Sequence, residues 1–190
     1  MPPRLQEQFR DTVAGKASET FKITNPMALP RLEKIVISVG LGNQLEGTKL
    51  NASAKETVLS DLATIAGQRA VMTKARKSVS NFKVREGYEN GARVTVRGTR
   101  MWELLDRLVS LAIPRIKDFR GLKTKSFDGQ GNYSFGVAEQ GIFPEVDMAN
   151  TSYAHGMNIT FTFRNSTDEI SRWVLAELGM PFAAEEEPAV

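Results

Sequence analysis

The sequence predicts an α+β fold: a mostly antiparallel sheet with helices covering one face, an open polar and basic face, and long protruding loops. Four segments alternate apolar and polar residues with period two, as strands buried on one face only do. Three further segments repeat apolar residues at helical spacing and can supply the cover. Strands and helices follow one another without the regular alternation of a doubly wound sheet, which favours the α+β class.

The strands are predicted from this alternation. They cover residues 34–39, 81–85, 93–97 and 157–164. In the first, Ile35 and Ile37 belong to the apolar set and Ser38 belongs to the other. The second set is mostly Lys, Arg, Thr, Ser and Asn in all four segments. We therefore expect one buried sheet face and one face that presents cations, hydroxyls and amides.

The helices are predicted from apolar stripes and from their end signals. They cover residues 52–66, 100–113 and 167–178, with a weakly patterned fourth over about 4–16. Gly67 follows the first and suits a left-handed end, and Pro114 ends the second. A capping-box pattern, Ser166-Thr167-Asp168-Glu169, opens the third.

A long stretch over residues 114–155 has many glycines and aromatics but little periodicity. Irregular segments of this length in a compact domain are usually functional loops, and the aromatics argue against disorder. We expect it to project as ordered loops. Residues 1–182 are predicted to form a single domain, and residues 183–190 an acidic disordered tail.

Several classes of function are disfavoured by what the chain lacks. It contains no cysteine and one histidine, His155, so we predict no metal site, no cofactor, no catalytic residues and no enzymatic activity. No apolar run approaches the roughly 20 residues that span a bilayer. The N-terminus has no apolar core of a secretory signal. A cytoplasmic protein without a membrane partner is expected.

The charge is unevenly distributed along the chain. Residues 69–125 carry 15 Lys/Arg against 5 Asp/Glu, whereas residues 126–190 carry 2 against 10. A basic block on a near-neutral protein is typical of a polyanion binder. The alternative is a solvated charged face with no partner.

A cluster within this block has the chemistry of RNA recognition. Thr73-Lys74-Ala75-Arg76-Lys77-Ser78 places three cations and two hydroxyls beside Asn81, Phe82 and Lys83. Cations neutralise phosphates, hydroxyls and amides bond phosphate or 2′-hydroxyl oxygens, and an aromatic ring can stack on an exposed base. The sequence therefore indicates an RNA-binding surface that combines this cluster with the open sheet face.

Strings distributed from about residue 5 to Phe182 resemble a known ribosomal family. They include Asn25-Pro26-Met27, Thr73-Lys74-Ala75-Arg76-Lys77-Ser78, Ile113-Pro114-Arg115-Ile116-Lys117-Asp118-Phe119-Arg120-Gly121-Leu122, Ser126-Phe127-Asp128-Gly129-Gln130-Gly131-Asn132-Tyr133 and Gln140-Gly141-Ile142-Phe143-Pro144-Glu145. The chain is thereby similar to the bacterial large-subunit ribosomal proteins that bind 5S rRNA, the fifth of the large-subunit series.

The resemblance implies a structural protein of the central protuberance of the large ribosomal subunit. Its implied partners are 5S rRNA, the elbow of the P-site tRNA, large-subunit rRNA with neighbouring ribosomal proteins, and a small-subunit head protein, the last forming an intersubunit bridge with the protruding loops. The residues assigned to rRNA are Ser38, Gln68, Thr73, Lys74, Arg76, Lys77, Ser78, Phe82, Arg93 and Thr95. Those assigned to a tRNA-contacting loop are Asn81, Lys83, Arg85 and Tyr88.

The chain departs from the pattern of this family at several places, of which two concern the assigned residues and their neighbours. Ser38 stands where many relatives have asparagine, which reduces an amide contact to a hydroxyl contact. Glu89-Asn90 replaces the more usual Pro-Ile, and it is expected to place an acid near the tip of a hairpin that faces tRNA phosphate.

Two other functions remain open on the residues alone. One is a generic RNA-binding regulatory protein with a one-sided basic sheet, although such sheets usually display paired aromatics where Arg93 and Thr95 stand here. The other is an enzyme acting on phosphorylated substrates, which would need an acid/base or metal set. Binding to 5S rRNA against an unrelated stem-loop separates the ribosomal function from the regulatory one.

Overall fold

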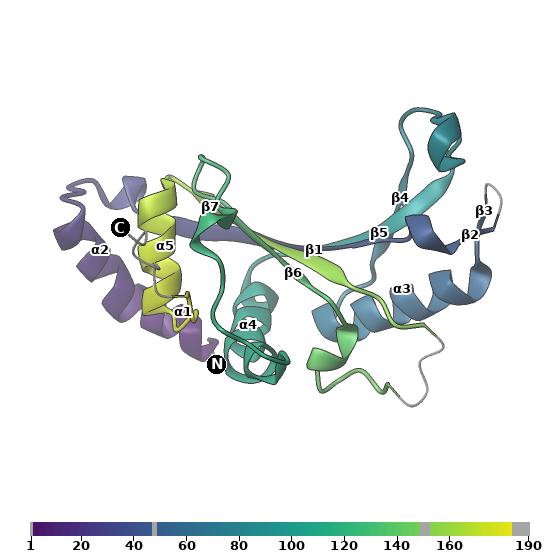
Figure 1. The fold of residues 1–190 in the computed structure, drawn as a ribbon. Coiled ribbons are helices and arrows are strands. Elements are labelled where there is room, and N and C mark those ends of the chain that lie inside the picture. Colours follow the sequence, from purple (N-terminus) through teal and green to yellow (C-terminus); the bar gives the residue numbers. More distant parts are fainter. Residues whose placement is uncertain (1, 47–48, 149–152, 184–190) are drawn as a thin grey trace, which may run out of the picture. The chain divides into compact units, whose positions relative to one another are not determined.

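The computed structural model describes residues 2–46, 49–148 and 153–183. Its main sheet has five strands in the order β4-β5-β1-β7-β6, and a two-stranded ribbon pairs β2 with β3 (Figure 1). The strands are β1 (Arg31–Gly40), β2 (Leu45–Glu46), β3 (Lys49–Leu50), β4 (Val71–Lys74), β5 (Glu89–Val96), β6 (Tyr133–Val137) and β7 (Met157–Arg164). The predicted α+β class with a mostly antiparallel sheet is confirmed.

The helices agree closely with the apolar stripes. They are α1 (Arg4–Gln8), α2 (Ala14–Thr20), α3 (Ala52–Ala66), α4 (Thr99–Arg107) and α5 (Asp168–Glu177). A π-helical turn, Phe9–Val13, joins α1 to α2, and α4 continues through Leu108–Ala112 and Ile113–Arg115. At the end of α3, Gly67 has φ 62°, the left-handed conformation that its position predicted.

The chain forms two compact units. One comprises Met1–Ile35, Arg97–Phe135 and Thr160–Val190; we call it the helical unit. The other comprises Val36–Val96 and Gly136–Ile159; we call it the hairpin unit. Each unit has its own buried apolar residues and is described separately.

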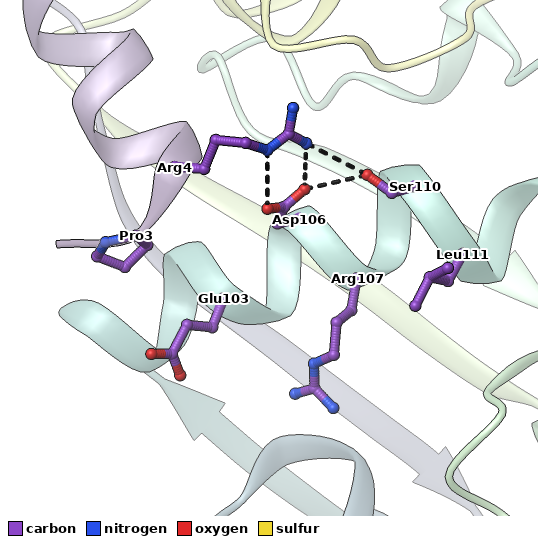
Figure 2. Close-up of a pocket in the computed structure, with 7 residues that line it drawn as sticks. All are labelled: Pro3, Arg4, Glu103, Asp106, Arg107, Ser110 and Leu111. Carbon is purple, nitrogen blue, oxygen red and sulfur yellow. Dashed lines mark hydrogen bonds and ion pairs between the residues drawn. The ribbon is translucent and has the colours of Figure 1, made fainter. Parts of the chain in front are cut away.

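In the helical unit, α1 packs against α4. The Arg4 guanidinium donates to Asp106 Oδ1 at 2.5 Å and Oδ2 at 3.2 Å, and Ser110 Oγ donates to the same carboxylate (Figure 2). The hydrogen bond from Arg4 lowers the pKa of Asp106. A groove of about 480 Å³ beside this contact is lined mainly by Glu103, Arg107 and Leu111 in addition to the bonded residues.

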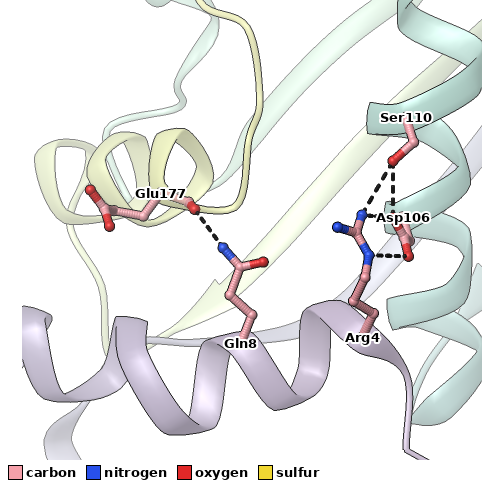
Figure 3. Close-up of polar contacts among 5 residues, drawn as sticks. All are labelled: Arg4, Gln8, Asp106, Ser110 and Glu177. Atoms are coloured by element: carbon pink, nitrogen blue, oxygen red, sulfur yellow. Dashed lines mark hydrogen bonds and ion pairs between the residues drawn. The ribbon is translucent and has the colours of Figure 1, made fainter.

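The helix α5 is tied to the same N-terminal segment. Gln8 Nε2 donates to the backbone oxygen of Glu177 at 3.2 Å (Figure 3), and Lys16 Nζ lies 2.9 Å from Glu177 Oε2. The start of α5 is capped by Thr167, whose Oγ1 accepts from the Ile170 amide. These polar contacts hold the helices in register around a core that includes Trp102, Tyr133 and Phe161.

In the hairpin unit, α3 packs on β5. The buried stripe of the helix is Ala54, Val58, Leu62 and Ile65, as its spacing predicted. The buried residues of β5 are Ala92, Val94 and Val96. One face of this part of the sheet is therefore covered, and the alternate residues of β5 point away from the helix.

The strand predicted over residues 81–85 is wrong. Ser80–Phe82 forms a 3-10 turn, Lys83 has φ 54°, and Val79 and Val84 form a single antiparallel bridge across the turn. The local alternation of Phe82 and Val84 arises in a tight turn, where no strand among the described residues continues the ladder beyond the Val79–Val84 bridge. Short alternating runs do not distinguish these two structures.

The stretch 114–155 is less loop-like than expected. It contains β6, and the side chains of Tyr133 and Phe143 are at most 1% exposed. Its aromatics partly fill the cores of the two units instead of small cores of their own. The turn before β6 is ordered by Asp168, whose carboxylate accepts from the amides of Gly129 and Gly131 at 2.9 and 2.6 Å.

Among the helices in the described ranges, none has the length and apolar character that crossing a membrane requires. The acidic tail expected over residues 183–190 lies, after Ala183, outside the described residues.

Candidate nucleic-acid interface

All fourteen residues assigned to rRNA or tRNA lie in the hairpin unit, between Ser38 and Thr95. The strands β4 and β5 pair antiparallel, with Val71 opposite Arg93 and Thr73 opposite Gly91. Residues directly opposite in such a pair project from the same face. Because Ala92 and Val94 are buried on the helix side, these four residues belong to the open face.

The strand β1 lies beside β5 and extends this face. Ile37 and Val39 are buried on the helix side, so Ser38 belongs to the open side and is half-buried. A side chain at Gly91 would lie 2.7 Å from the Val39 backbone oxygen and 3.0 Å from Thr73 Oγ1. Glycine at this position therefore lets β4, β5 and β1 lie side by side without a clash between a side chain and the Val39 backbone oxygen. The predicted open polar face is confirmed here.

Residues 75–88 connect β4 to β5 and form an ordered loop, which we call the hairpin loop. At its base, the Ala75 amide donates to the Tyr88 oxygen at 2.8 Å and the Gly87 amide donates to the Ala75 oxygen at 3.0 Å. Further out, Val79 and Val84 exchange two backbone hydrogen bonds of 2.9 and 3.2 Å. The hairpin loop is therefore a small hairpin continuing the larger one, and Figure 1 shows it between β4 and β5.

The Ser78 side chain helps to hold this loop. Its Oγ accepts a hydrogen bond of 2.9 Å from the Glu86 amide. The hydroxyl proton of Ser78 stays available as a donor to an RNA oxygen. Thr73 Oγ1 lies 3.5 Å from Asn90 Oδ1, so this hydroxyl also has a neighbour within the protein. Two residues assigned to RNA contact are thus structural as well.

The charge of the hairpin loop is positive and exposed. Residues 69–96 contain seven Lys/Arg against two Glu. The side chains of Lys74, Arg76, Lys77, Lys83 and Arg85 are all exposed. Such a group of cations on a projecting hairpin neutralises phosphates and raises the rate of encounter with a polyanion.

The expectation for Glu89 is wrong. Glu89 is the first residue of β5 and is not at the tip of the hairpin, which lies at residues 80–83. Its Oε2 is 2.6 Å from Lys55 Nζ on α3. Because Lys55 compensates its charge, Glu89 does not place a free acid among the cations of the loop.

Exposed apolar side chains gather in the same hairpin. Phe82 is 75% exposed at its tip and Val71 is 69% exposed on the open face, and Val79 and Tyr88 are also exposed. Exposed rings among cations suit stacking on unpaired bases. Phe82 and Tyr88 were assigned from the sequence. Val71 and Val79 were not, although Val71-Met72-Thr73 is a short β-type run after Gly67 that could have indicated β4.

The structure separates the assigned residues into two groups. Six of them, Ser38, Gln68, Thr73, Lys74, Arg93 and Thr95, lie on or beside the sheet. The other eight lie within the hairpin loop, with those assigned to rRNA and those assigned to tRNA interleaved. Thr95 on β5 is seven residues from Tyr88 at the end of the hairpin loop, about 23 Å at strand spacing. The assigned residues thus form one extended surface, with the sheet at one end and the hairpin loop at the other, and they do not line a compact pocket.

Comparisons with known proteins give the same family over nearly the whole described chain. Residues 25–85 match the family model described as "Ribosomal protein L5", and residues 89–182 match "ribosomal L5P family C-terminus". The chain is 49% identical over 179 residues to "Large ribosomal subunit protein uL5" of Marinomonas sp. (strain MWYL1), covering 94% of this chain and 98% of that protein. With this identity over nearly the full length of both chains, the protein belongs to the ribosomal protein L5 family of the large ribosomal subunit.

Proposed function

We propose that this protein is a structural, non-enzymatic component of cytoplasmic ribosomes that binds 5S rRNA in the central protuberance of the large subunit. The open face of β4, β5 and β1 binds 5S rRNA, and the hairpin loop contacts the elbow of the P-site tRNA. A small-subunit head protein contacts the loops within residues 114–155. Large-subunit rRNA and neighbouring ribosomal proteins are further partners.

The observation that carries the proposal is the continuity of one polar surface. Arg93 and Thr73 on the sheet lead directly to the exposed cations of the hairpin loop, and the acid Glu89 beside them is paired with Lys55. Hydroxyls and cations on an open sheet suit a folded RNA whose backbone and 2′-hydroxyls are accessible. Exposed Phe82 adds a surface for stacking.

The shape of the hairpin loop supports its proposed contact with tRNA. It extends the β4–β5 hairpin by a second small hairpin whose turn carries Asn81, Phe82 and Lys83. A projecting basic tip can reach an RNA that does not lie against the sheet. The two sets of assigned residues are interleaved along the loop, with Phe82 of the rRNA set at its tip and Tyr88 of the tRNA set at its base, so both RNAs are proposed to contact the same loop.

The protein contact is proposed from charge. Glu139, Glu145 and Asp147 follow β6 and give this segment the opposite sign to the hairpin loop. Carboxylates repel RNA phosphates and suit a basic protein. The intersubunit bridge is therefore assigned to the acidic part of residues 114–155 and its ordered turns.

The test is equilibrium binding of the full chain to purified 5S rRNA and to an unrelated stem-loop of equal length at the same salt concentration. We expect clear preference for 5S rRNA, lost when Arg93 and Thr95 are replaced together. Equal affinity for both RNAs would contradict the proposal and favour a generic RNA-binding regulator. Incubation with a panel of nucleotides is expected to give no turnover, and turnover would contradict the non-enzymatic assignment.

A further inference from the structure

The helical unit carries a basic segment of its own. Residues 115–125, which we call the basic segment, contain five Lys/Arg and one acid, Asp118, a local net charge of +4. All five cationic residues are exposed: Arg115, Lys117, Arg120, Lys123 and Lys125. Within the described part of the chain, none of them is paired with a carboxylate. The proposed RNA contacts lie in the hairpin unit and do not use these side chains.

The last described residues of the chain are fixed against the basic segment. The Leu122 amide donates to the Pro181 oxygen at 2.8 Å, and the Ala183 amide donates to the Leu122 oxygen at 2.9 Å. Leu122 and Phe182 thus form a parallel bridge. The ring of Phe182 packs edge-on against that of buried Tyr133, with centroids 5.4 Å apart. Backbone pairing and ring packing therefore determine where the chain continues beyond Ala183.

Gly121 brings the two paired stretches closer together than another residue could. A Cβ at this position would lie 2.5 Å from the Ala183 Cα, and the φ of Gly121 is 106°, so any other residue would be strained on both counts. Arg120 and Lys123 flank Gly121 and Leu122 in the sequence. The chain beyond Ala183 therefore starts beside exposed cations.

The residues that follow Ala183 have the opposite charge. Residues 184–190, the acidic tail, lie outside the described residues, and their sequence is Ala-Glu-Glu-Glu-Pro-Ala-Val. The three glutamates come two to four residues after Ala183, so the chain limits their backbone to within about 14 Å of it. Opposite charges attract through solvent over about a Debye length, roughly 8 Å at physiological salt. The fold thus tethers three carboxylates at high effective concentration beside unpaired cations.

We propose that the acidic tail binds the basic segment of the same chain through Glu185, Glu186 and Glu187 and competes there with RNA phosphates. A single exposed ion pair contributes little, but three tethered carboxylates do not lose the freedom of association that a separate partner loses. The tail then acts as an internal polyanion that shields the basic segment from nonspecific RNA. The inference concerns the helical unit and does not depend on the proposed 5S rRNA contact of the hairpin unit.

The first test measures the contact directly. Because the chain has no cysteine, Ala189→Cys provides a single site for a nitroxide label within the acidic tail. At low salt the label is expected to broaden the amide NMR signals of residues 115–120, and about 1 M salt should remove the broadening because the Debye length falls to about 3 Å. The matched protein carries the same label with Glu185, Glu186 and Glu187 replaced by glutamine, and its broadening should be much weaker. Equal broadening with glutamate and glutamine would overturn the inference.

The second test measures the competition with RNA, using a short RNA duplex of unrelated sequence. Replacing the three glutamates of the tail by glutamine should tighten binding at least about threefold, the low end for three exposed ion pairs. The gain should disappear when the five cations of the basic segment are also replaced by glutamine, because the tail then shields nothing. Additive effects of the two sets of substitutions would overturn the inference and mean that the tail acts only through net charge.

A charge-matched variant is the control for this cycle. Glu7→Gln, Asp11→Asn and Glu19→Gln together remove three acids from exposed positions of the helical unit. Their effect on affinity for the duplex should be the same with and without the five cations, because a change in net charge acts on the whole field of the protein. A coupling with the basic segment as large as that of the tail would also overturn the inference.

Discussion

Thr95 belongs to the polar set of its alternating segment, and it is half-buried on the open face, between buried Val94 and Val96. If its hydroxyl bonds RNA, Thr95→Leu should weaken 5S rRNA binding by about 1–3 kcal/mol, the cost of leaving a polar group unpaired in a buried interface. The fold should be intact. Filter binding measures the first effect and thermal unfolding the second.

Thr162→Leu is the matched control for this change. Thr162 is half-buried on β7 in the helical unit and is not assigned to RNA, so this variant should bind 5S rRNA normally. Val94→Ala should instead destabilise the protein by about 1.5–3 kcal/mol, because its side chain is 2% exposed in the core. Unfolding of Thr95→Leu together with a silent Val94→Ala would mean that the two faces are reversed.

Burial makes the charged form of Asp61 unfavourable for folding. Burial raises its pKa above the ordinary 3.8, and the nearby His155 opposes that shift only in part. A raised carboxyl pKa means that the folded state binds a proton more tightly than the unfolded state does. Proton binding by Asp61 therefore stabilises the fold at low pH, and this stabilisation is lost as the pH rises above 3.8 through the folded pKa. Asp61→Asn, which cannot ionise, should therefore unfold at a higher temperature than the unmodified protein at pH 7.

The gain should shrink as pH is lowered and vanish below pH 3.8, where Asp61 is protonated in both states. Thermal unfolding of the two proteins between pH 7 and the acid limit of stability measures it. A lower unfolding temperature for Asp61→Asn at pH 7 would mean that the carboxylate has a stabilising partner in the fold.

At the scale of elements, the β4–β5 hairpin carries most of the proposed RNA contacts. Replacing Lys74, Arg76 and Lys77 by glutamine should make the fall of log affinity with log salt shallower by about two to three units, roughly one for each lost phosphate contact. Affinity for 5S rRNA measured over a series of salt concentrations gives the slope. The three side chains are exposed, so stability should change little.

A triple variant at Arg10, Lys22 and Arg31 is the control for this element, because it removes three exposed cations from the helical unit. Its slope should match that of the unmodified protein. An unchanged slope in the hairpin variant would show that the cluster does not contact 5S rRNA, and it would leave the tRNA as its proposed partner.

At the scale of the whole molecule, the turn before β6 tests whether the proposed bridge is separable from RNA binding. The structure limits the deletion to residues 128–132, since Tyr133 is fully buried and begins β6. Shortening 128–132 to an Asn-Gly turn should leave 5S rRNA binding intact and weaken association of reconstituted subunits, measured by sedimentation. A matched substitution of Gly129 alone, which keeps the length, should have a smaller effect.

The deletion also removes the contacts of Asp168 with Gly129 and Gly131, so thermal unfolding of the variant must accompany the assay. A stable variant that loses 5S rRNA binding while subunits associate normally would contradict the assignment of this turn to the intersubunit bridge. In that case the turn before β6 would belong to the RNA contact.

Sequence patterns alone predict the α+β class, α3, β7 and the two faces of β1 and β5. The apolar periodicity of these long segments matches the burial that the fold gives them, because core burial is the dominant favourable term in folding. The family strings also located the residues of the candidate interface, since a basic cluster within one hairpin is contiguous in the chain.

Only the tertiary structure decided features that depend on residues distant in sequence. The turn at 80–83 replaced a predicted strand because no neighbouring strand pairs with it. Lys55 on α3 neutralised Glu89. The strand β6 alternates in Tyr-Ser-Phe-Gly-Val, but it is short and lies within a glycine-rich stretch that was predicted to form loops. Asp61 and His155 are 94 residues apart in the sequence, and nothing local to either indicates that their side chains lie 3.8 Å apart. Long-range packing and charge pairing fix these features, and short-range sequence patterns carry no signal of them.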